Sequence, residues 1–370
     1  MLAPTELSVC RLARVARAAC LASLLMMAAA AVHAASFAYI ANYMSATVSV
    51  VDTTGNLVVA TIAVVAFPDG VAISPDGSRV YVDGALNGDV SVIDAATNTV
   101  ISTVPGMNGG GHGGAAMAPN GAKVYIANAY RNSVSVLDTT TNTIAKTIPV
   151  GTFPYGVAVN PRLPRVYVAN NSAGTLSVID TSTDTVIATV PMPFGPYAIA
   201  VDPGGARAYV ATQIGDVVVL DTATNAVVDT FQTGFLNIFG IAIAPDGSRL
   251  YTANSTANSV GVVSATTGAV LATVPTGNAP FSVGLNRSAT RLYVTNTQSN
   301  DVSVIDTATN SVVRTIPVGT FPMPVGLFVG PELAPPAPAH PVPANAPWAI
   351  LVGAGIVLAA GLARNVARAA

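Results

Sequence analysis

The chain has 370 residues, a formal net charge of -2, 51% hydrophobic residues and only 9% charged residues. This balance excludes an intrinsically disordered chain and a nucleic-acid binder with a strongly basic surface. The 32 glycines and 26 prolines, among many Thr, Val, Asn and Asp residues, are typical of short strands joined by tight turns. An all-β fold is therefore expected.

The first 35 residues have the layout of a secretory signal peptide. Three arginines precede an apolar stretch over residues 18–32, and small residues follow it, so cleavage is expected after Ala34 or Ala35. A retained N-terminal anchor is the alternative. Because both cysteines, Cys10 and Cys20, lie in this segment, the mature chain would have neither disulfides nor cysteine-based chemistry.

A tyrosine followed by a β-like segment recurs every 42 to 44 residues in the middle of the chain. The seven tyrosines are Tyr39, Tyr81, Tyr125, Tyr167, Tyr209, Tyr251 and Tyr293. Each unit is expected to contain four short strands; in the unit that begins at Tyr167 these are residues 167–170, 177–180, 186–190 and 198–201. Four strands per ~42 residues is the period of a β-propeller blade.

Two kinds of turn are predicted among the repeats. Pro-Asp-Gly sequences at residues 75–77 and 245–247 should close hairpins between the fourth strand of one unit and the tyrosine strand of the next, with Gly at a positive φ. Six aspartates each end a strand before a Thr- or Asn-rich turn, and they are expected to accept hydrogen bonds from turn N–H groups rather than to bind calcium. They are Asp52, Asp94, Asp138, Asp180, Asp221 and Asp306.

The repeats also predict how the fold closes. The ordered part should begin with a tyrosine strand at residues 37–40 and end with an unpartnered strand of the fourth type at residues 325–329. That last strand should join the three N-terminal strands, which leaves no open edge. The expected fold is an all-β, seven-bladed propeller of four-stranded blades over residues 36–330, closed by N- and C-terminal strands that share one blade.

The repeat motif resembles a known family. Tyr293-Val294-Thr295-Asn296 matches the motif of the YVTN β-propeller repeat family, and residues 39–42, 125–128 and 167–170 are close variants. Three further segments, residues 81–84, 209–212 and 251–254, match it more loosely. The resemblance covers roughly four-fifths of the chain. It implies the propeller fold and an extracytoplasmic setting, with distant relatives among lactonases and the propeller domains of redox enzymes.

Two segments follow the repeats. Residues 331–347 are a Pro/Ala-rich linker, and residues 348–370 contain a run of sixteen apolar residues followed by a basic tail. As a helix this run would measure about 24 Å, enough to span a membrane with some thinning.

The end of the chain also resembles bacterial sorting signals of the IPTL type. Val342, Pro343 and Trp348 have the spacing of that motif, although Ala344-Asn345 replaces the usual Thr-Leu. The resemblance implies recognition by the sorting machinery at the membrane, followed by removal of the tail or by surface attachment.

Aligning the units on the predicted inner strand places a largely aromatic column at one mouth of the central channel. Its members are Asp69, Gly113, Tyr155, Tyr197, Phe239, Phe281 and Met323. The last five, called here the aromatic column, are candidate ligand-binding residues, because their side chains could stack on a sugar, a quinone-like ring or a base. The alternative is that they pack under loops or plug the channel.

His112 should stand beside the same mouth, in a glycine-rich segment that departs from the other units. It replaces a proline found at the equivalent position of five other units, and no other histidine occurs in residues 36–330. Asp69 and His112 come from nearly equivalent positions of adjacent units, so they could approach each other and act as an acid/base pair. A loosely held loop histidine is the alternative.

Residues 36–330 contain no Cys, no Glu and one His, which excludes a copper cluster, paired haem ligands and a three-histidine zinc site. No metal or cofactor is therefore expected. Sixteen Asp against eleven Lys and Arg in this region disfavour nucleic acid as a partner.

The sequence thus favours an exported bacterial binding protein of the periplasm, outer membrane or cell surface. Its ligand, a small molecule or a protein, would lie at the aromatic mouth. An enzyme of lactonase or lyase type that uses His112 and Asp69 at this mouth, and a scaffold for a protein partner, are the alternatives.

Overall fold

The computed structural model describes residues 36–106, 111–193 and 195–330. These residues contain β-strands and two single-turn 3-10 helices, η1 (Tyr43–Ser45) and η2 (Ala129–Arg131), and no α-helix. The predicted all-β class is confirmed. The predicted signal peptide, linker and C-terminal membrane segment lie outside the described residues.

Hydrogen bonding groups the strands of the described residues into six sheets. One sheet has three strands: β1 (Phe37–Asn42), β2 (Thr47–Asp52) and β3 (Leu57–Ala63). Two more groups are β4 (Pro68–Ile73), β5 (Arg79–Gly84), β6 (Val90–Asp94) and β7 (Thr99–Val104), and β8 (Ala115–Met117), β9 (Lys123–Asn128), β10 (Ser133–Asp138) and β11 (Thr143–Pro149). These two groups join through β28 (Val325–Gly326) into one sheet of nine strands.

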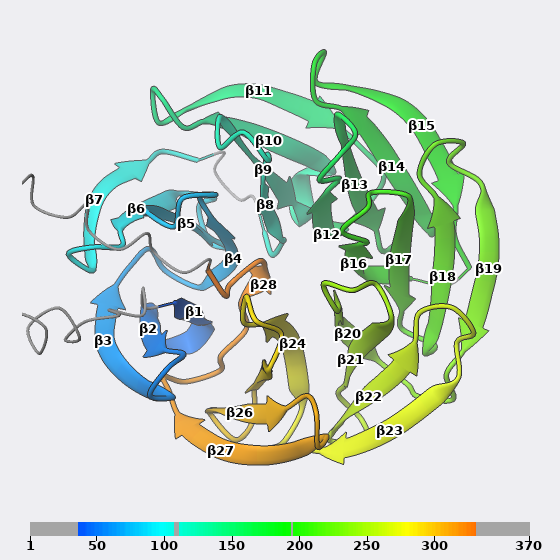
Figure 1. The fold of residues 1–370 in the computed structure, drawn as a ribbon. Coiled ribbons are helices and arrows are strands. Elements are labelled where there is room, and N and C mark those ends of the chain that lie inside the picture. Colours follow the sequence, from blue (N-terminus) through cyan, green and yellow to red (C-terminus); the bar gives the residue numbers. More distant parts are fainter. Residues whose placement is uncertain (1–35, 107–110, 194, 331–370) are drawn as a thin grey trace, which may run out of the picture. The chain divides into compact units, whose positions relative to one another are not determined.

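The other four sheets have four strands each, in chain order. They are β12 (Pro154–Val159), β13 (Arg165–Asn170), β14 (Thr175–Asp180) and β15 (Thr185–Pro191); β16 (Pro196–Val201), β17 (Arg207–Thr212), β18 (Asp216–Asp221) and β19 (Val227–Gln232); β20 (Ile238–Ile243), β21 (Arg249–Asn254), β22 (Ser259–Ser264) and β23 (Val270–Pro275); and β24 (Pro280–Leu285), β25 (Arg291–Asn296), β26 (Asp301–Asp306) and β27 (Ser311–Pro317). The sheets follow one another around a common centre (Figure 1).

Each four-stranded sheet begins with the fourth strand of one sequence unit and continues with the tyrosine strand of the next. The predicted Pro-Asp-Gly hairpins make such a connection between β4 and β5 and between β20 and β21, where Gly77 and Gly247 have φ values of 73° and 71°. Their N–H groups donate to the carbonyl oxygens of Ser74 and Ala244, each at 2.8 Å. Glycine is needed here because a β-carbon disfavours a positive φ.

The inner strands approach one another too closely for larger side chains at some positions. A β-carbon placed on Gly156 of β12 would lie 2.3 Å from the carbonyl oxygen of Tyr197, and one on Gly240 of β20 would lie 2.5 Å from that of Phe281. The small residues of the inner strands therefore have a packing role.

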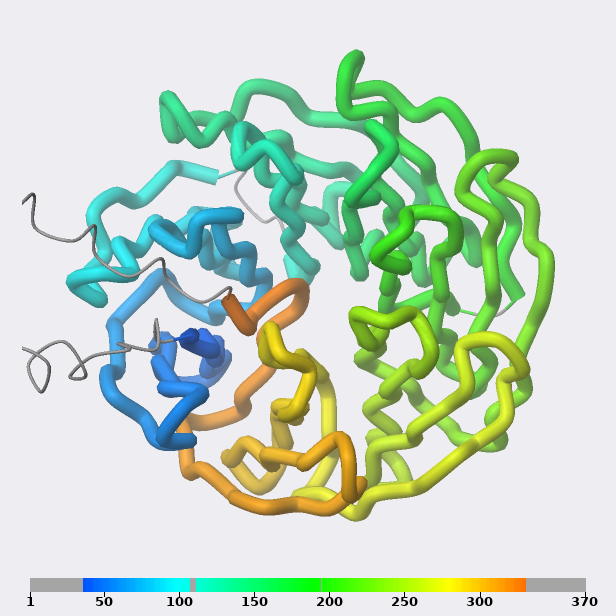
Figure 2. Tube along the Cα trace, in the orientation of Figure 1, coloured from blue at the N-terminus to red at the C-terminus, as the bar shows by residue number. Residues whose placement is uncertain are grey.

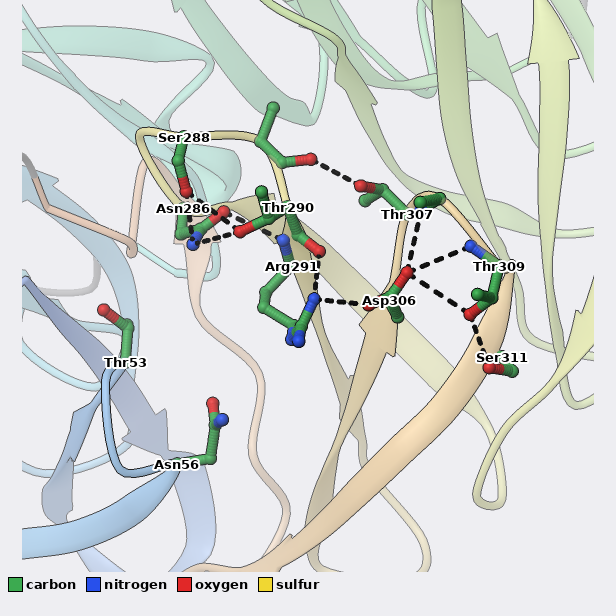
Figure 3. Close-up of polar contacts among 12 residues, drawn as sticks. Thr53, Asn56, Asn286, Ser288, Thr290, Arg291, Asp306, Thr307, Thr309 and Ser311 are labelled. Atoms are coloured by element: carbon green, nitrogen blue, oxygen red, sulfur yellow. Dashed lines mark hydrogen bonds and ion pairs between the residues drawn. The ribbon is translucent and has the colours of Figure 1, made fainter.

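The aspartates that end the second strand of most units cap the following turn, as predicted. Asp180 Oδ1 accepts hydrogen bonds from the N–H groups of Ser182 and Thr183 at 2.8 and 3.1 Å. Figure 3 shows the same arrangement at Asp306, which also pairs with Arg291 at 2.6 Å. These bonds lower the pKa of both carboxyl groups.

Residues of the repeat motif join neighbouring strands and sheets. The tyrosines are buried, and the Tyr293 hydroxyl donates to Asn56 Oδ1 at 2.7 Å, in the turn between β2 and β3. The motif asparagine acts within one sheet: Asn170 Nδ2 donates to the hydroxyls of Thr175 and Ser177 at 3.0 and 2.9 Å. The motif is thus explained by packing and hydrogen bonding.

The last described residues run beside the first strand. The Tyr39 N–H donates to the Phe328 carbonyl at 2.7 Å, the Met323 N–H to Ala41 at 2.8 Å, and the Gly330 N–H to Phe37 at 2.8 Å. Figure 2 shows this orange segment beside the blue N-terminal strands. Strand β28 itself pairs in parallel with β4 and β8.

Candidate functional site

The aromatic column lies where the inner strands begin. Tyr155, Tyr197, Phe239 and Phe281 are the second residues of β12, β16, β20 and β24, and Met323 follows Pro322. Ring centroids are 4.1 Å apart for Tyr155 and Tyr197, 4.7 Å for Tyr197 and Phe239, and 5.2 Å for Phe239 and Phe281. The structure therefore brings all five predicted residues into one cluster.

The side chains of the aromatic column pack mainly on each other. Tyr155, Phe281 and Met323 are buried, with 3%, 8% and 6% of their surface exposed, while Tyr197 and Phe239 are half-buried. Burial raises the pKa of Tyr155 well above its ordinary value, and the Tyr197 hydroxyl contributes. The column thus packs into one apolar cluster where the inner strands begin. Its predicted contact with a ligand stays a prediction, with Tyr197 and Phe239 its accessible members.

The structure also brings His112 and Asp69 together. His112 Nδ1 lies 3.4 Å from Asp69 Oδ2, which is an electrostatic contact longer than a well-formed hydrogen bond. The Asp69 side chain is fully buried, whereas 28% of the His112 side chain is exposed. Asp69 is held in place by the N–H groups of Gly70 and Gly113, at 2.8 and 3.1 Å.

Tyr43, from η1, extends this contact to a third side chain. Its hydroxyl lies 3.1 Å from His112 Nε2, and the two rings stack with centroids 5.0 Å apart. Burial, followed by the negative charge of Asp69, raises the pKa of Tyr43, so the hydroxyl keeps its proton at neutral pH. If Tyr43 donates to Nε2, the proton of a neutral His112 lies on Nδ1, facing Asp69.

A second buried carboxylate, Asp83 of β5, stands behind Asp69. Only 2% of Asp83 is exposed, and a β-carbon placed on Gly70 would lie 3.1 Å from its Cβ. Burial and then the charge of Asp69 raise the pKa of Asp83 well above its ordinary value. Burial also raises the pKa of Asp69, but His112 and two N–H donors oppose that shift. Asp83 is therefore the favoured site for a proton shared by the pair.

Four aromatic residues surround these side chains. Three of them, Phe67, Phe153 and Phe321, are half-buried and precede a proline, with φ between 53° and 57°. A left-handed backbone is uncommon for so bulky a residue and costs ~1–3 kcal/mol. Tyr130, from η2, is 62% exposed, and its ring centroid lies 6.2 Å from that of His112 and 6.0 Å from that of Phe153.

We call Tyr43, Asp69, Asp83 and His112 the His112 cluster, and Phe67, Tyr130, Phe153 and Phe321 the outer aromatic patch. Of these eight residues, sequence reasoning singled out only Asp69 and His112. Asp83 had a signal, because it places a carboxylate where other units have Ala or Thr in the repeat motif. The three phenylalanines share a position before a proline. Nothing in the repeat marks Tyr43 or Tyr130.

The His112 cluster can bind and exchange protons. His112 has one nitrogen facing a buried carboxylate and the other facing a hydroxyl, an arrangement that orients the imidazole ring. Among the described residues, no group of three or more His, Cys, Asp or Glu side chains is placed to hold a metal ion. In the same part of the chain, no helix is long and apolar enough to cross a membrane.

Comparisons with known proteins bear on the fold. No protein-family model matches the chain, and no curated protein sequence is significantly similar to it. A structure described as Kuenenia stuttgartiensis hydrazine synthase is similar at a TM-score of 0.68 and 23% identity, over 73% of this chain and 92% of that one. A protein of unknown function from Desulfotomaculum acetoxidans gives a TM-score of 0.70 and 16% identity, over 80% of this chain and 99% of that one. At these identities the likeness concerns the fold alone, and with the repeated four-stranded sheets it supports a β-propeller.

Proposed function

We propose that this β-propeller is a binding module whose ligand lies on the surface formed by the His112 cluster and the outer aromatic patch. One observation carries the proposal: a partly exposed histidine is held between a tyrosine hydroxyl and a fully buried carboxylate. Burying a carboxylate is costly, and propeller packing does not require it at this position, where most other units have an aromatic side chain. Such a cost is typical of a functional site.

The chemistry of the surface indicates the kind of ligand. The exposed Tyr130 ring and the half-buried Phe153 ring offer apolar faces, and His112 and Tyr43 offer a hydrogen-bond donor or acceptor. A sugar or another ring-shaped molecule with hydroxyl or carbonyl groups fits both features. The aromatic column, with Tyr197 and Phe239 half-buried, would form the floor of this site.

The proposal includes a ring of seven blades. The recurrence of seven tyrosine strands supports the count. The bonds that join residues 322–330 to β1, and the hydrogen bond that Ser282 donates to the Pro324 carbonyl, support a final blade made from both chain ends. The motif segments, Tyr293-Val294-Thr295-Asn296 above all, support membership of the YVTN family.

We also propose that the protein is exported and attached to the membrane or sorted to the cell surface. The support comes from sequence features: the signal-peptide layout of residues 1–35, the linker at residues 331–347, and the Val342, Pro343 and Trp348 pattern ahead of an apolar, basic tail. All of these features lie outside the described residues.

The geometry of the His112 cluster also supports a second candidate function, that of an enzyme with acid/base chemistry of the lactonase or lyase type. His112 would accept a proton at Nε2 from Tyr43 as the tyrosine takes one from the substrate, while Asp69 stabilises the imidazolium. The partly exposed imidazole and the partly buried Tyr43 hydroxyl are the groups that a substrate could reach.

A thermal-shift screen of the protein against sugars, lactones and quinones tests the proposal, because a ligand that binds only the folded state raises Tm. A ligand of this surface should bind roughly 3- to 10-fold more weakly to Tyr130→Ala, which removes one stacking ring. Leu271→Ala on the outer strand β23 removes another exposed apolar side chain and should change nothing.

Three outcomes separate the candidates. Binding that Tyr130→Ala weakens, without turnover, supports the binding module. Turnover that His112→Ala and Asp69→Asn abolish supports the enzyme. If no compound raises Tm, or if hits are insensitive to Tyr130→Ala and His112→Ala, the proposed site is wrong and a scaffold for a protein partner becomes the better explanation.

A further inference from the structure

A cavity of about 750 Å³ opens at the other end of the inner strands. Whereas the aromatic column occupies the second position of these strands, the cavity is lined by their later residues and by the turns that follow, such as Ile73, Ser74 and Pro75. Phe239 is a member of the aromatic column and also lines the cavity, so it lies at the inner end of the cavity. No residue of the His112 cluster or of the outer aromatic patch lines the cavity.

The wall of this channel cavity is mainly apolar. The inner strands contribute small or aliphatic residues, among them Ala158, Ile199 and Ala242, all only half-buried. Ser74, Ser282 and Asn286 contribute polar side chains, but each already donates a hydrogen bond, to Asp76, to the Pro324 carbonyl and to Ser288 respectively. Water inside would find few hydrogen-bond partners along the wall, so an apolar molecule would displace it favourably. The volume is within the range of small-molecule sites, ~300–1,000 Å³.

The rim of the channel cavity carries one charge among the residues that line it. In the turn that follows the inner strand, five units have a proline at the position where a sixth unit has Arg287. The prolines are Pro75, Pro119, Pro161, Pro203 and Pro245, all but Pro203 lining the cavity. Arg287 is exposed and is the one cationic lining residue in the described structure.

The aspartates of two neighbouring turns are not paired with Arg287. Asp76 and Asp246 follow Pro75 and Pro245, but each accepts hydrogen bonds from a serine of its own turn, Ser78 or Ser248. Neither aspartate lines the cavity. A ligand that enters the channel cavity thus meets an apolar wall with one guanidinium at its rim.

We propose that the channel cavity binds an anionic amphiphile, such as a medium-chain fatty acid. The alkyl chain lies among the inner strands, and the carboxylate pairs with Arg287 at the rim. Each buried methylene strengthens binding up to about fourfold, so affinity rises with chain length until the cavity is filled. The guanidinium, which offers two parallel N–H donors to a carboxylate, selects for the anionic head group.

Isothermal titration calorimetry of the full chain with dodecanoate, below its critical micelle concentration, tests the proposal. The expected result is saturable 1:1 binding that is about tenfold weaker in Arg287→Gln and in Arg287→Pro, the latter carrying the residue of the other units. Dodecan-1-ol, which lacks the charge, should bind all three proteins alike. Arg314→Gln, on the outer strand β27, is the matched control and should bind dodecanoate as the parent protein does.

Two further variants test the position of the alkyl chain. Ala242→Phe and Ala158→Phe would fill the cavity from different inner strands, and each should abolish binding of both compounds while the melting temperature shows that the protein remains folded. His112→Ala should bind dodecanoate normally, because the channel cavity does not depend on the proposed function. Absence of saturable binding, equal affinity in Arg287→Gln, or binding retained in both phenylalanine variants would overturn the proposal.

Discussion

At the scale of single residues, the paired carboxylates of Asp69 and Asp83 are the least expected feature of this propeller. Both are buried, and both have a raised pKa, mainly because burial disfavours the charged form. His112 and the N–H groups of Gly70 and Gly113 oppose the rise in the pKa of Asp69, whereas the charge of Asp69 adds to the rise in the pKa of Asp83. Asp69, which faces His112, thus has a second buried acid beside it, at a cost in stability that depends on pH.

We expect Asp83→Asn to stabilise the protein at pH 7 to 8. The pKa of Asp83 is higher in the folded than in the unfolded state, so the folded state binds more protons between the two values and stability falls as pH rises through that window. Asparagine at position 83 does not titrate, so this loss of stability with rising pH does not occur in the variant. The gain should be ~1–3 kcal/mol at pH 7 to 8, the usual desolvation cost of a buried polar group, and should vanish near pH 4. Thermal unfolding at a series of pH values measures it.

An equal Tm difference between Asp83→Asn and the parent protein at pH 4 and pH 8 would contradict this explanation. Asp229→Asn is a suitable control, because Asp229 is an exposed residue of the outer strand β19. It should show no such dependence on pH.

At the scale of elements, the inner strands combine two requirements. They must approach their neighbours closely, which explains Gly156 and Gly240, and they must carry larger residues where each sheet packs on the next. The alternation of small and larger residues along one strand satisfies both. The same elements begin in the aromatic column and end in the channel cavity.

Gly240→Ala should destabilise the protein by ~1–3 kcal/mol, the usual cost of overpacking. The added β-carbon would lie 2.5 Å from the Phe281 carbonyl oxygen and 3.0 Å from Ser282 Cα, so the backbone must move. Denaturant unfolding measures the loss. Gly204→Ala is the matched control, because its β-carbon would meet nothing closer than 3.9 Å and its φ is not positive. If both variants are equally stable, close strand approach is not the reason for the glycine.

At the scale of the whole molecule, residues 322–330 join parts that are far apart in the chain. They bond to β1, pair with β4 and β8, and contribute Phe328, whose side chain is fully buried. In the proposed ring these contacts would complete the blade that begins with β1 to β3. Without them, β1 would present an open edge.

A chain that ends at residue 330 keeps all of these contacts, and we expect it to unfold at the temperature of the full chain. A chain that ends at residue 320 loses them, together with buried Phe328 and Met323. It should be destabilised by at least ~3–5 kcal/mol, the cost of removing one large core side chain, and should aggregate through the exposed edge. Calorimetry and light scattering would show both effects; equal unfolding temperatures would refute the closing role of this segment.

Local information in the sequence determined much of the secondary structure and turn chemistry of this protein. Strand positions, the hairpins at Gly77 and Gly247 and the capping role of Asp180 and its equivalents follow from side-chain alternation and turn chemistry, which act within a few residues. In-register repeats carried that information further, since they place Asp69 and His112 at nearly equivalent positions of adjacent units. The β-propeller fold and the approach of these two residues could therefore be predicted.

Only the tertiary structure decided which side chains are buried and which meet across units. Tyr43 reaches His112 from another unit, Asp83 lies behind Asp69, and the aromatic column is packed on itself. The channel cavity likewise arises from residues of several inner strands that no local pattern brings together. The physical reason is that burial and pKa depend on neighbours distant in the chain, which a repeat pattern aligns but does not place in contact.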